Sequence, residues 1–161
     1  WEYSFISYIV ALYEPISKTY KIYMLKIEHL GIAVSDLQKS IPLFEQLLNT
    51  PCYKTEVVEN EGVSTAFFQT GDSKIELLEA TRNDSPIKKF IDKKGEGIHH
   101  IAFEVENIEA EMKRLSALGF ELLNEHPKNG ADNKLICFLH PKTTNGVLIE
   151  LCQEKKNQDS L

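Results

Sequence analysis

The stretch GIHHIAFEV, residues 97–105, places two histidines side by side at the start of a segment with the composition of a β-strand. Adjacent side chains of a strand point to opposite faces of the sheet. His99 therefore shares a face with apolar residues, whereas His100 shares the other face with Ala102 and Glu104. This parity predicts that His100 faces a cavity and that His99 packs against a helix or a second sheet.

A second stretch of the chain repeats the first. IEHLGIAVSDL, residues 27–37, overlays IHHIAFEVENI, residues 98–108, without a gap. The overlay sets His29 on His100, whereas His99 falls on a glutamate, so the position of His99 does not require a histidine. Because an internal repeat indicates a structural unit used more than once, His29 and His100 are candidate functional residues.

The repeat continues to the end of each half. KIELLEA at 74–80 overlays LIELCQE at 148–154, which sets Glu76 on Glu150. The two glutamates lie slightly farther apart in sequence than the two histidines, so the second half carries a short net insertion. The chain is therefore predicted to use one module twice.

Each half predicts the order βαβββ from its apolar periodicity and its turn residues. In the first half we expect strands at 26–34, 52–59, 63–70 and 74–80 and a helix at 36–48, where Ser35 or Asp36 caps the helix. In the second half we expect strands at 98–106, 120–124, 134–140 and 146–152 and a helix at 108–118. A short helix that starts at Asp84, Ser85 and Pro86 is predicted in the segment between the halves.

The 161 residues suit one compact domain made of two modules that share a core. We expect module one at 26–80, a linker at 81–96 and module two at 97–153, all within a single domain at 24–155. A tail follows at 156–161. Residues 1–23 form an extension of uncertain role: an unrelated upstream stretch, a helix that packs on a partner, or a poor targeting segment.

Composition excludes several classes of function. The net charge of −6, without a basic stripe among aromatic residues, argues against a nucleic-acid partner. No apolar run is long enough to span a membrane. The three widely spaced cysteines form neither a zinc motif nor a disulfide framework, which favours the reducing cytoplasm.

Four side chains are candidates for one metal centre. If each module is a sheet curved by its twist, its first and last strands can face a common cleft, which brings His29, Glu76, His100 and Glu150 together. Imidazole and carboxylate ligands suit Co, Zn, Mn, Ni or Fe. The alternative interpretation is that Glu76 lies on a solvent-exposed face of its strand and binds no metal. The duplication of both residue types at matched positions favours the metal site.

Residues 26–153 resemble the methylmalonyl-CoA epimerases of the vicinal-oxygen-chelate superfamily, which also includes glyoxalase I and the extradiol dioxygenases. The stretches that carry the resemblance are IEHLGIAV, KIELLEAT, GEGIHHIAFEV and FLHPKTTNGVLIEL. The resemblance implies an α+β fold of two tandem βαβββ modules, forming a curved mixed sheet around a metal-binding cleft with the helices outside. It also implies a homodimer.

The resemblance further implies a divalent metal bound by His29, His100 and Glu150, with a fourth contact at Glu76. Co²⁺ is expected first, with Zn²⁺, Mn²⁺ or Ni²⁺ as alternatives. The implied reaction on the acyl-CoA thioester is exchange of (R)- and (S)-methylmalonyl-CoA through a metal-stabilised enolate. Thr65 stands where some relatives carry a glutamate base, so Glu150 and Glu76 are the candidate proton-transfer residues.

Three other functions remain open for the same cluster. A glyoxalase I-like isomerase would use the same metal ligands with another pocket. An extradiol-type Fe(II) dioxygenase would use two histidines and one glutamate and consume oxygen. The third alternative is a protein of this fold that binds a small molecule without catalysis. The retention of all four ligand-type residues argues against this alternative.

Overall fold

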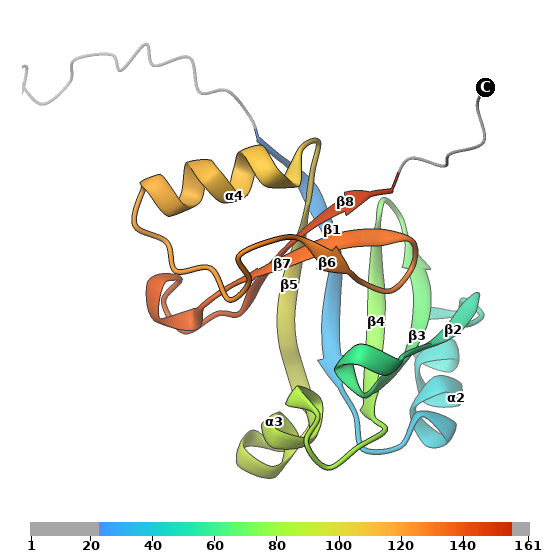
Figure 1. Ribbon diagram of the computed structural model, residues 1–161. Coiled ribbons are helices and arrows are strands. Elements are labelled where there is room, and N and C mark those ends of the chain that lie inside the picture. The colour runs from blue at the N-terminus through green and yellow to red at the C-terminus, as the bar shows by residue number, and fades with distance from the viewer. Residues whose placement is uncertain (1–22, 156–161) are drawn as a thin grey trace, which may run out of the picture.

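The computed structural model describes residues 23–155 and places its strands in one mixed sheet (Figure 1). The strand order is β2-β3-β4-β1-β5-β8-β7-β6. Module one contains β1 (Met24–Ala33), α2 (Leu37–Leu48), β2 (Lys54–Val58), the short 3-10 helix η1 (Glu59–Glu61), β3 (Val63–Thr70) and β4 (Ser73–Ala80). The linker carries α3 (Pro86–Lys94). Module two contains β5 (Gly97–Val105), α4 (Ile108–Ala117), β6 (Lys128–Asn129), β7 (Lys134–Leu139), η2 (Pro141–Thr143) and β8 (Ile149–Glu154).

The two modules meet at the centre of the sheet. In each module the first and last strands pair in parallel, β1 with β4 and β5 with β8. β1 and β5 then pair with each other in the antiparallel sense, which joins the modules into one curled sheet. The predicted fold, an α+β arrangement of repeated βαβββ units, is confirmed.

Matched residues cap the two module helices. The Asp36 side chain accepts a hydrogen bond from the backbone N–H of Lys39, and the Asn107 side chain accepts one from Ala110. These caps satisfy N–H groups that the first helical turn leaves without partners. Beyond the caps, each helix turns an apolar stripe onto the outer face of its own half of the sheet.

The linker helix α3 lies at one end of the sheet, below β1 and β5 in Figure 1. Ser85 caps it through a hydrogen bond from the Ile87 N–H (3.2 Å), and Pro86 occupies the first turn, as predicted. Ile87 is buried against Ala33, Val63 and Leu78, so α3 closes one end of the cleft.

In module two, one predicted strand is wrong and the bounds of another are shifted. The segment 120–124 is reduced to an isolated bridge between Leu122 and Leu139, and the two-residue β6 pairs with β7 farther along. The ladder stops because the Asn124 side chain, rather than a backbone carbonyl, accepts from the Phe138 N–H. The last strand begins at Ile149 instead of 146, after η2 and a turn.

Among the described residues, no helix is long and apolar enough to cross a membrane. The predictions for residues 1–22 and for the tail 156–161 lie outside the described residues.

Candidate metal centre

The four predicted ligands lie on the four central strands of the sheet. Glu76 of β4 is paired in register with Gly31 of β1, two residues after His29. Glu150 of β8 is paired with Ala102 of β5, two residues after His100. The matched register shows that the sequence repeat is also a repeat of the site.

The four side chains converge on one buried point. The Nε2 atoms of His29 and His100 lie 2.9 Å apart. Glu76 Oε2 lies 3.3 Å from His29 Nε2 and 3.6 Å from His100 Nε2. Glu150 Oε2 lies 3.9 Å and 3.2 Å from the same two atoms. Each of the four residues is at most 5% exposed.

This spacing and this donor set fit a divalent metal. Ligand atoms about 2.1 Å from a metal lie about 3 Å apart on adjacent octahedral positions. The ligand atoms of His29, His100 and Glu150 all lie within 4.8 Å of one another. Glu76 is not part of that triad, but its contacts to both histidines place it as the fourth candidate. Among the described residues, neither glutamate forms an ion pair with a lysine or arginine, so the nearest partners of both carboxylates are the two histidines.

The electrostatics of the cluster also favour a positive charge at its centre. Burial lowers the pKa of His29, but the carboxylates of Glu76 and Glu28 outweigh burial and raise it to about 10. Burial lowers the pKa of His100 well below its usual value, and the charge on His29 lowers it further. Burial raises the pKa of Glu150 to about 8. The carboxylates of Glu76 and Glu28 thus stabilise a proton on His29. A metal cation at the centre of the cluster would supply the same positive charge.

A β-bulge precedes each of the two histidines. Ile27 pairs with Phe103 and His29 with Ala102, so Glu28 is the extra residue in β1. On β5, the register shift makes His99 the extra residue. A bulge breaks the alternation of side chains between the two faces.

The bulge on β5 corrects the prediction for His99. Strand parity places His99 and His100 on opposite faces, yet their Nδ1 atoms lie 3.0 Å apart and both rings line the cavity. The expected packing of His99 against a helix is present, because its ring meets Phe90 of α3 edge-on. Burial, with a smaller effect of Lys94, lowers the pKa of His99 to about 4, so neutral His99 can accept a hydrogen bond from His100.

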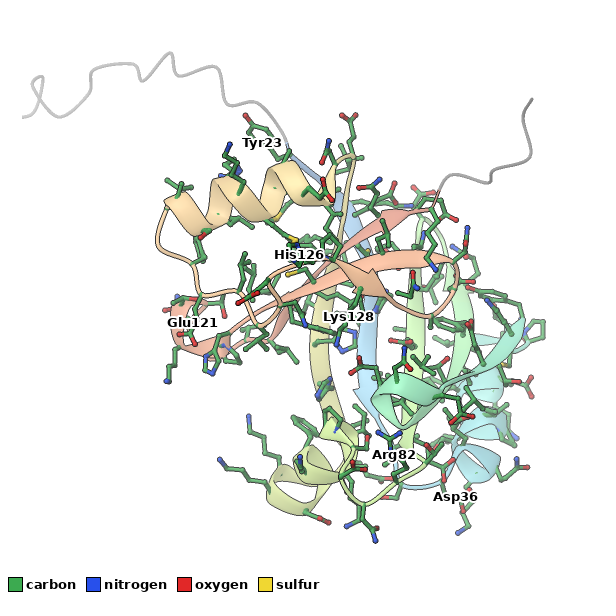
Figure 2. The ribbon with its side chains drawn as sticks, viewed as in Figure 1. Tyr23, Asp36, Arg82, Glu121, His126 and Lys128 are labelled. Atoms are coloured by element: carbon green, nitrogen blue, oxygen red, sulfur yellow. The ribbon has the colours of Figure 1, made fainter. Side chains whose placement is uncertain are left out.

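A cavity of about 310 Å³ lies in front of the cluster. Residues 128–133, which we call the strap, cross from module two over this cavity to module one. Lys128 forms an ion pair with Glu61 at 2.6 Å, and Figure 2 shows Lys128 in the middle of the view, in front of the sheet. At the other end of the strap, Asp132 accepts hydrogen bonds from Lys54 and Lys74 of module one. Sequence reasoning missed the strap, because no periodic pattern marks these contacts.

A family model described as the glyoxalase/bleomycin resistance protein/dioxygenase superfamily matches residues 28–138. The chain belongs to this superfamily.

Individual proteins of known name show which members of the superfamily this chain resembles. The uncharacterized protein YqjC of Bacillus subtilis is 40% identical over 135 residues, which are 84% of this chain and 96% of that protein. Human mitochondrial methylmalonyl-CoA epimerase is 40% identical over 129 residues, 80% of this chain and 73% of that protein. A solved structure of a Streptomyces coelicolor methylmalonyl-CoA epimerase variant with 2-nitronate-propionyl-CoA is 36% identical, has a TM-score of 0.79, and matches over 83% of this chain and 99% of that one.

The resemblance drawn from the sequence is therefore confirmed, and so is the expectation of an enzyme of the epimerase type. Within this superfamily fold, Thr65 lies on β3 in the cavity wall, 1% exposed, and its hydroxyl donates to the backbone carbonyl of Glu56. A threonine hydroxyl is no general base near neutral pH. Glu76 and Glu150 thus stay the candidates for proton transfer, and the ligand assignments stay predictions.

Proposed function

We propose that this chain is a metal-dependent epimerase that interconverts (R)- and (S)-methylmalonyl-CoA by removing and returning the α-proton. The observation that carries the proposal is the position of the two carboxylates. Glu76 on β4 and Glu150 on β8 flank the histidine pair from its two sides, because β1 and β5 lie between those strands. A reaction that takes a proton from one face of a carbon and returns it to the other needs such a flanking pair.

His29, His100 and Glu150 would hold the metal, with Glu76 as the fourth contact. This nitrogen and oxygen set suits Co²⁺ first, with Zn²⁺, Mn²⁺ or Ni²⁺ as alternatives. When bound, a divalent cation supplies Lewis acidity toward the oxygens of an acyl thioester and its carboxylate.

The two glutamates would carry the proton. Both contact the histidines through Oε2, and both side chains line the cavity. The Oε1 atoms are then the atoms that exchange a proton with the substrate carbon. Burial raises the pKa of the Glu150 carboxyl, whereas a bound cation lowers it, so the metal would keep Glu150 ionised and able to accept a proton.

The walls of the cavity would exclude water from the carbanionic carbon. Phe67 and Leu78 of module one and Ile136 and Phe138 of module two line it. A volume of about 310 Å³ lies at the lower end of the range for small-molecule sites. It suits the short methylmalonyl group, while the coenzyme A moiety extends outside.

Proton NMR of methylmalonyl-CoA in D₂O tests this function directly. With Co²⁺-loaded protein we expect the α-proton signal to disappear and both enantiomers to form from either one. A Glu76→Gln/Glu150→Gln double variant is the control for exchange that does not need the two carboxylates. Persistence of the α-proton would contradict the proposal. Turnover of a glutathione thiohemiacetal, or oxygen consumption with a catechol and Fe(II), would instead support the glyoxalase-like or the dioxygenase alternative.

The homodimer and the cytoplasmic location are also part of the proposal. The dimer is supported by the family resemblance alone, and the compartment by three free thiols, Cys52, Cys137 and Cys152. Sedimentation equilibrium and fractionation of the source cells test them; a monomer over the micromolar range would contradict the first.

A further inference from the structure

The second ring nitrogen of His29 has a carboxylate partner. Glu28 Oε2 lies 2.6 Å from His29 Nδ1, and Glu28 is only 3% exposed. Neighbouring residues of a regular strand cannot make this contact, because their side chains diverge. The bulge at Glu28 turns both side chains into the cleft.

The surroundings of Glu28 fix the direction of this hydrogen bond. The other carboxylate oxygen, Oε1, accepts from Lys74 Nζ at 2.5 Å, and Lys134 Nζ lies 3.4 Å from it. Two ammonium groups stabilise the ionised carboxylate, which can only accept. Nδ1 of His29 therefore carries a proton and donates it to Glu28. Nε2, the atom that points at the other three candidate ligands, is then the nitrogen whose lone pair would bind a metal.

Lys74 is in turn held by the strap. Its Nζ donates to Asp132 Oδ2 at 2.7 Å, and Asp132 belongs to module two. A chain of charged contacts thus runs from Asp132 through Lys74 and Glu28 to His29. Lys54 also contacts Asp132 (3.2 Å) but does not contact Glu28, which makes it a matched control.

His100 has no such partner. Its Nδ1 faces Nδ1 of His99 at 3.0 Å, and His99 packs on Phe90. Of the two equivalent histidines, one is oriented by a charged carboxylate and the other by a neutral imidazole.

We propose that Glu28 is a positioning residue for the metal centre: it fixes the tautomer and orientation of His29, and the Lys74–Asp132 contact holds Glu28 in place. The proposal rests on the metal-binding part of the proposed function. A carboxylate behind a ligating imidazole increases the basicity of the ligand atom. His29 is then the better ordered of the two histidines, and the affinity for metal depends on a contact between the modules.

The test is the affinity of the full chain for Co²⁺, measured by competition with a chromophoric chelator, together with the visible absorption spectrum of bound Co²⁺. Glu28→Gln keeps the size of the side chain but leaves one acceptor oxygen for two donors, and Glu28→Asp restores the charge on a shorter stem. Glu104→Gln is the matched control, because Glu104 pairs with Lys26 away from the cleft. Lys74→Met removes a contact to Glu28 and a contact to the strap, whereas Lys54→Met removes a contact to the strap but none to Glu28. Comparing the two variants separates the effect of Glu28 from the effect of the strap.

We expect Glu28→Gln to weaken Co²⁺ binding by about 10- to 100-fold and to shift the Co²⁺ spectrum. Lys74→Met should weaken binding less, in the same direction, and Glu28→Asp should recover part of the loss. Lys54→Met and Glu104→Gln should match the wild type. If Glu28→Gln fails to fold by circular dichroism, Lys74→Met and Glu28→Asp decide.

Two results would overturn the inference, and they are distinguishable. If wild-type protein binds Co²⁺ and Glu28→Gln binds it equally well with the same spectrum, Glu28 does not position the ligand and the proposed function stands. If wild-type protein binds no divalent metal, the metal part of the proposed function fails as well. Equal losses for Lys54→Met and Lys74→Met would show that the strap, rather than Glu28, controls the site.

Discussion

Module one and module two contribute the same candidate ligands but differ at the edge of the sheet. In module one the edge strand β2 has five residues and pairs with β3 over its whole length. In module two the corresponding edge is reduced to the two-residue β6 at the start of the strap, and the rest of the strap leaves the sheet to contact module one. The duplicated strands bring two histidines and two glutamates to the centre in a symmetric arrangement, and the divergent edges make the cavity asymmetric.

This difference has a chemical meaning. A symmetric set of ligands can hold a metal and place a carboxylate on each side of it. Methylmalonyl-CoA itself is asymmetric, with a thioester on one side of its reacting carbon and a carboxylate on the other. The unequal walls of the two modules provide the features that can orient such a molecule.

Removing either histidine should produce the largest effect, because it breaks the symmetric pair. We expect His29→Ala and His100→Ala each to lose at least about 100-fold in metal affinity, more than the loss typical of a supporting residue. His99→Ala, at the neighbouring position, should stay within about tenfold of wild type. Bound metal after dialysis, measured by mass spectrometry, checks this. An equal or greater loss for His99→Ala would contradict the assignment of His100.

The two carboxylates can be compared one at a time. We expect Glu150→Gln and Glu76→Gln each to slow epimerisation by about 10²- to 10⁴-fold, the usual contribution of a general acid–base group. Each variant should still exchange the α-proton of one enantiomer with D₂O, and the two variants should differ in which one.

Proton NMR on separate (R)- and (S)-methylmalonyl-CoA, at saturating metal, makes the measurement. If Glu150→Gln exchanges the α-protons of both enantiomers at a near wild-type rate, Glu150 binds the metal but does not transfer the proton. The same result for Glu76→Gln would place the second base elsewhere.

The cores of the modules can be compared through the residue that follows each glutamate. Leu77 and Leu151 are both fully buried, each against the helix of its own module. We expect either substitution by Ala to lower the free energy of unfolding by about 2–5 kcal/mol. Because β1 and β5 join the modules, unfolding of the wild-type chain in urea should be one transition by both circular dichroism and the NMR signals of the Leu77 and Leu151 methyl groups. Two separate transitions would mean that the modules unfold independently.

The smallest effect is expected at Thr65. Thr65→Val keeps the shape of the cavity wall and removes one hydrogen bond to the Glu56 carbonyl. That loss should cost about 1 kcal/mol in stability, with the turnover number little changed. Urea denaturation and the NMR assay check both values. A large loss of turnover would show that the hydroxyl takes part in the reaction.

Much of the fold follows from local sequence patterns. The overlay of His29 on His100 and of Glu76 on Glu150 identified the repeat, and apolar periodicity located the two module helices and β3 to within a residue or two. These features depend on residues close together in the chain, so a sequence can reveal them. The strand predicted at 120–124 is wrong because the Asn124 side chain accepts the hydrogen bond from the Phe138 N–H that a backbone carbonyl would accept in a regular strand pair.

What the sequence by itself determined is the duplicated module and the four candidate site residues, of which each repeat carries one histidine and one glutamate to the same strand positions. What only the tertiary structure decided is which side chains contact and orient the two histidines. Glu28 and His99 turn into the cleft through bulges, and a bulge is a property of two paired strands rather than of one. Glu28 then meets Lys74, and Lys74 meets Asp132, across 46 and 58 residues of chain. The first contact joins two strands of module one, and the second forms only when the curled sheet brings the two modules face to face. Neither contact leaves a periodic signal, because its partners are far apart in the chain.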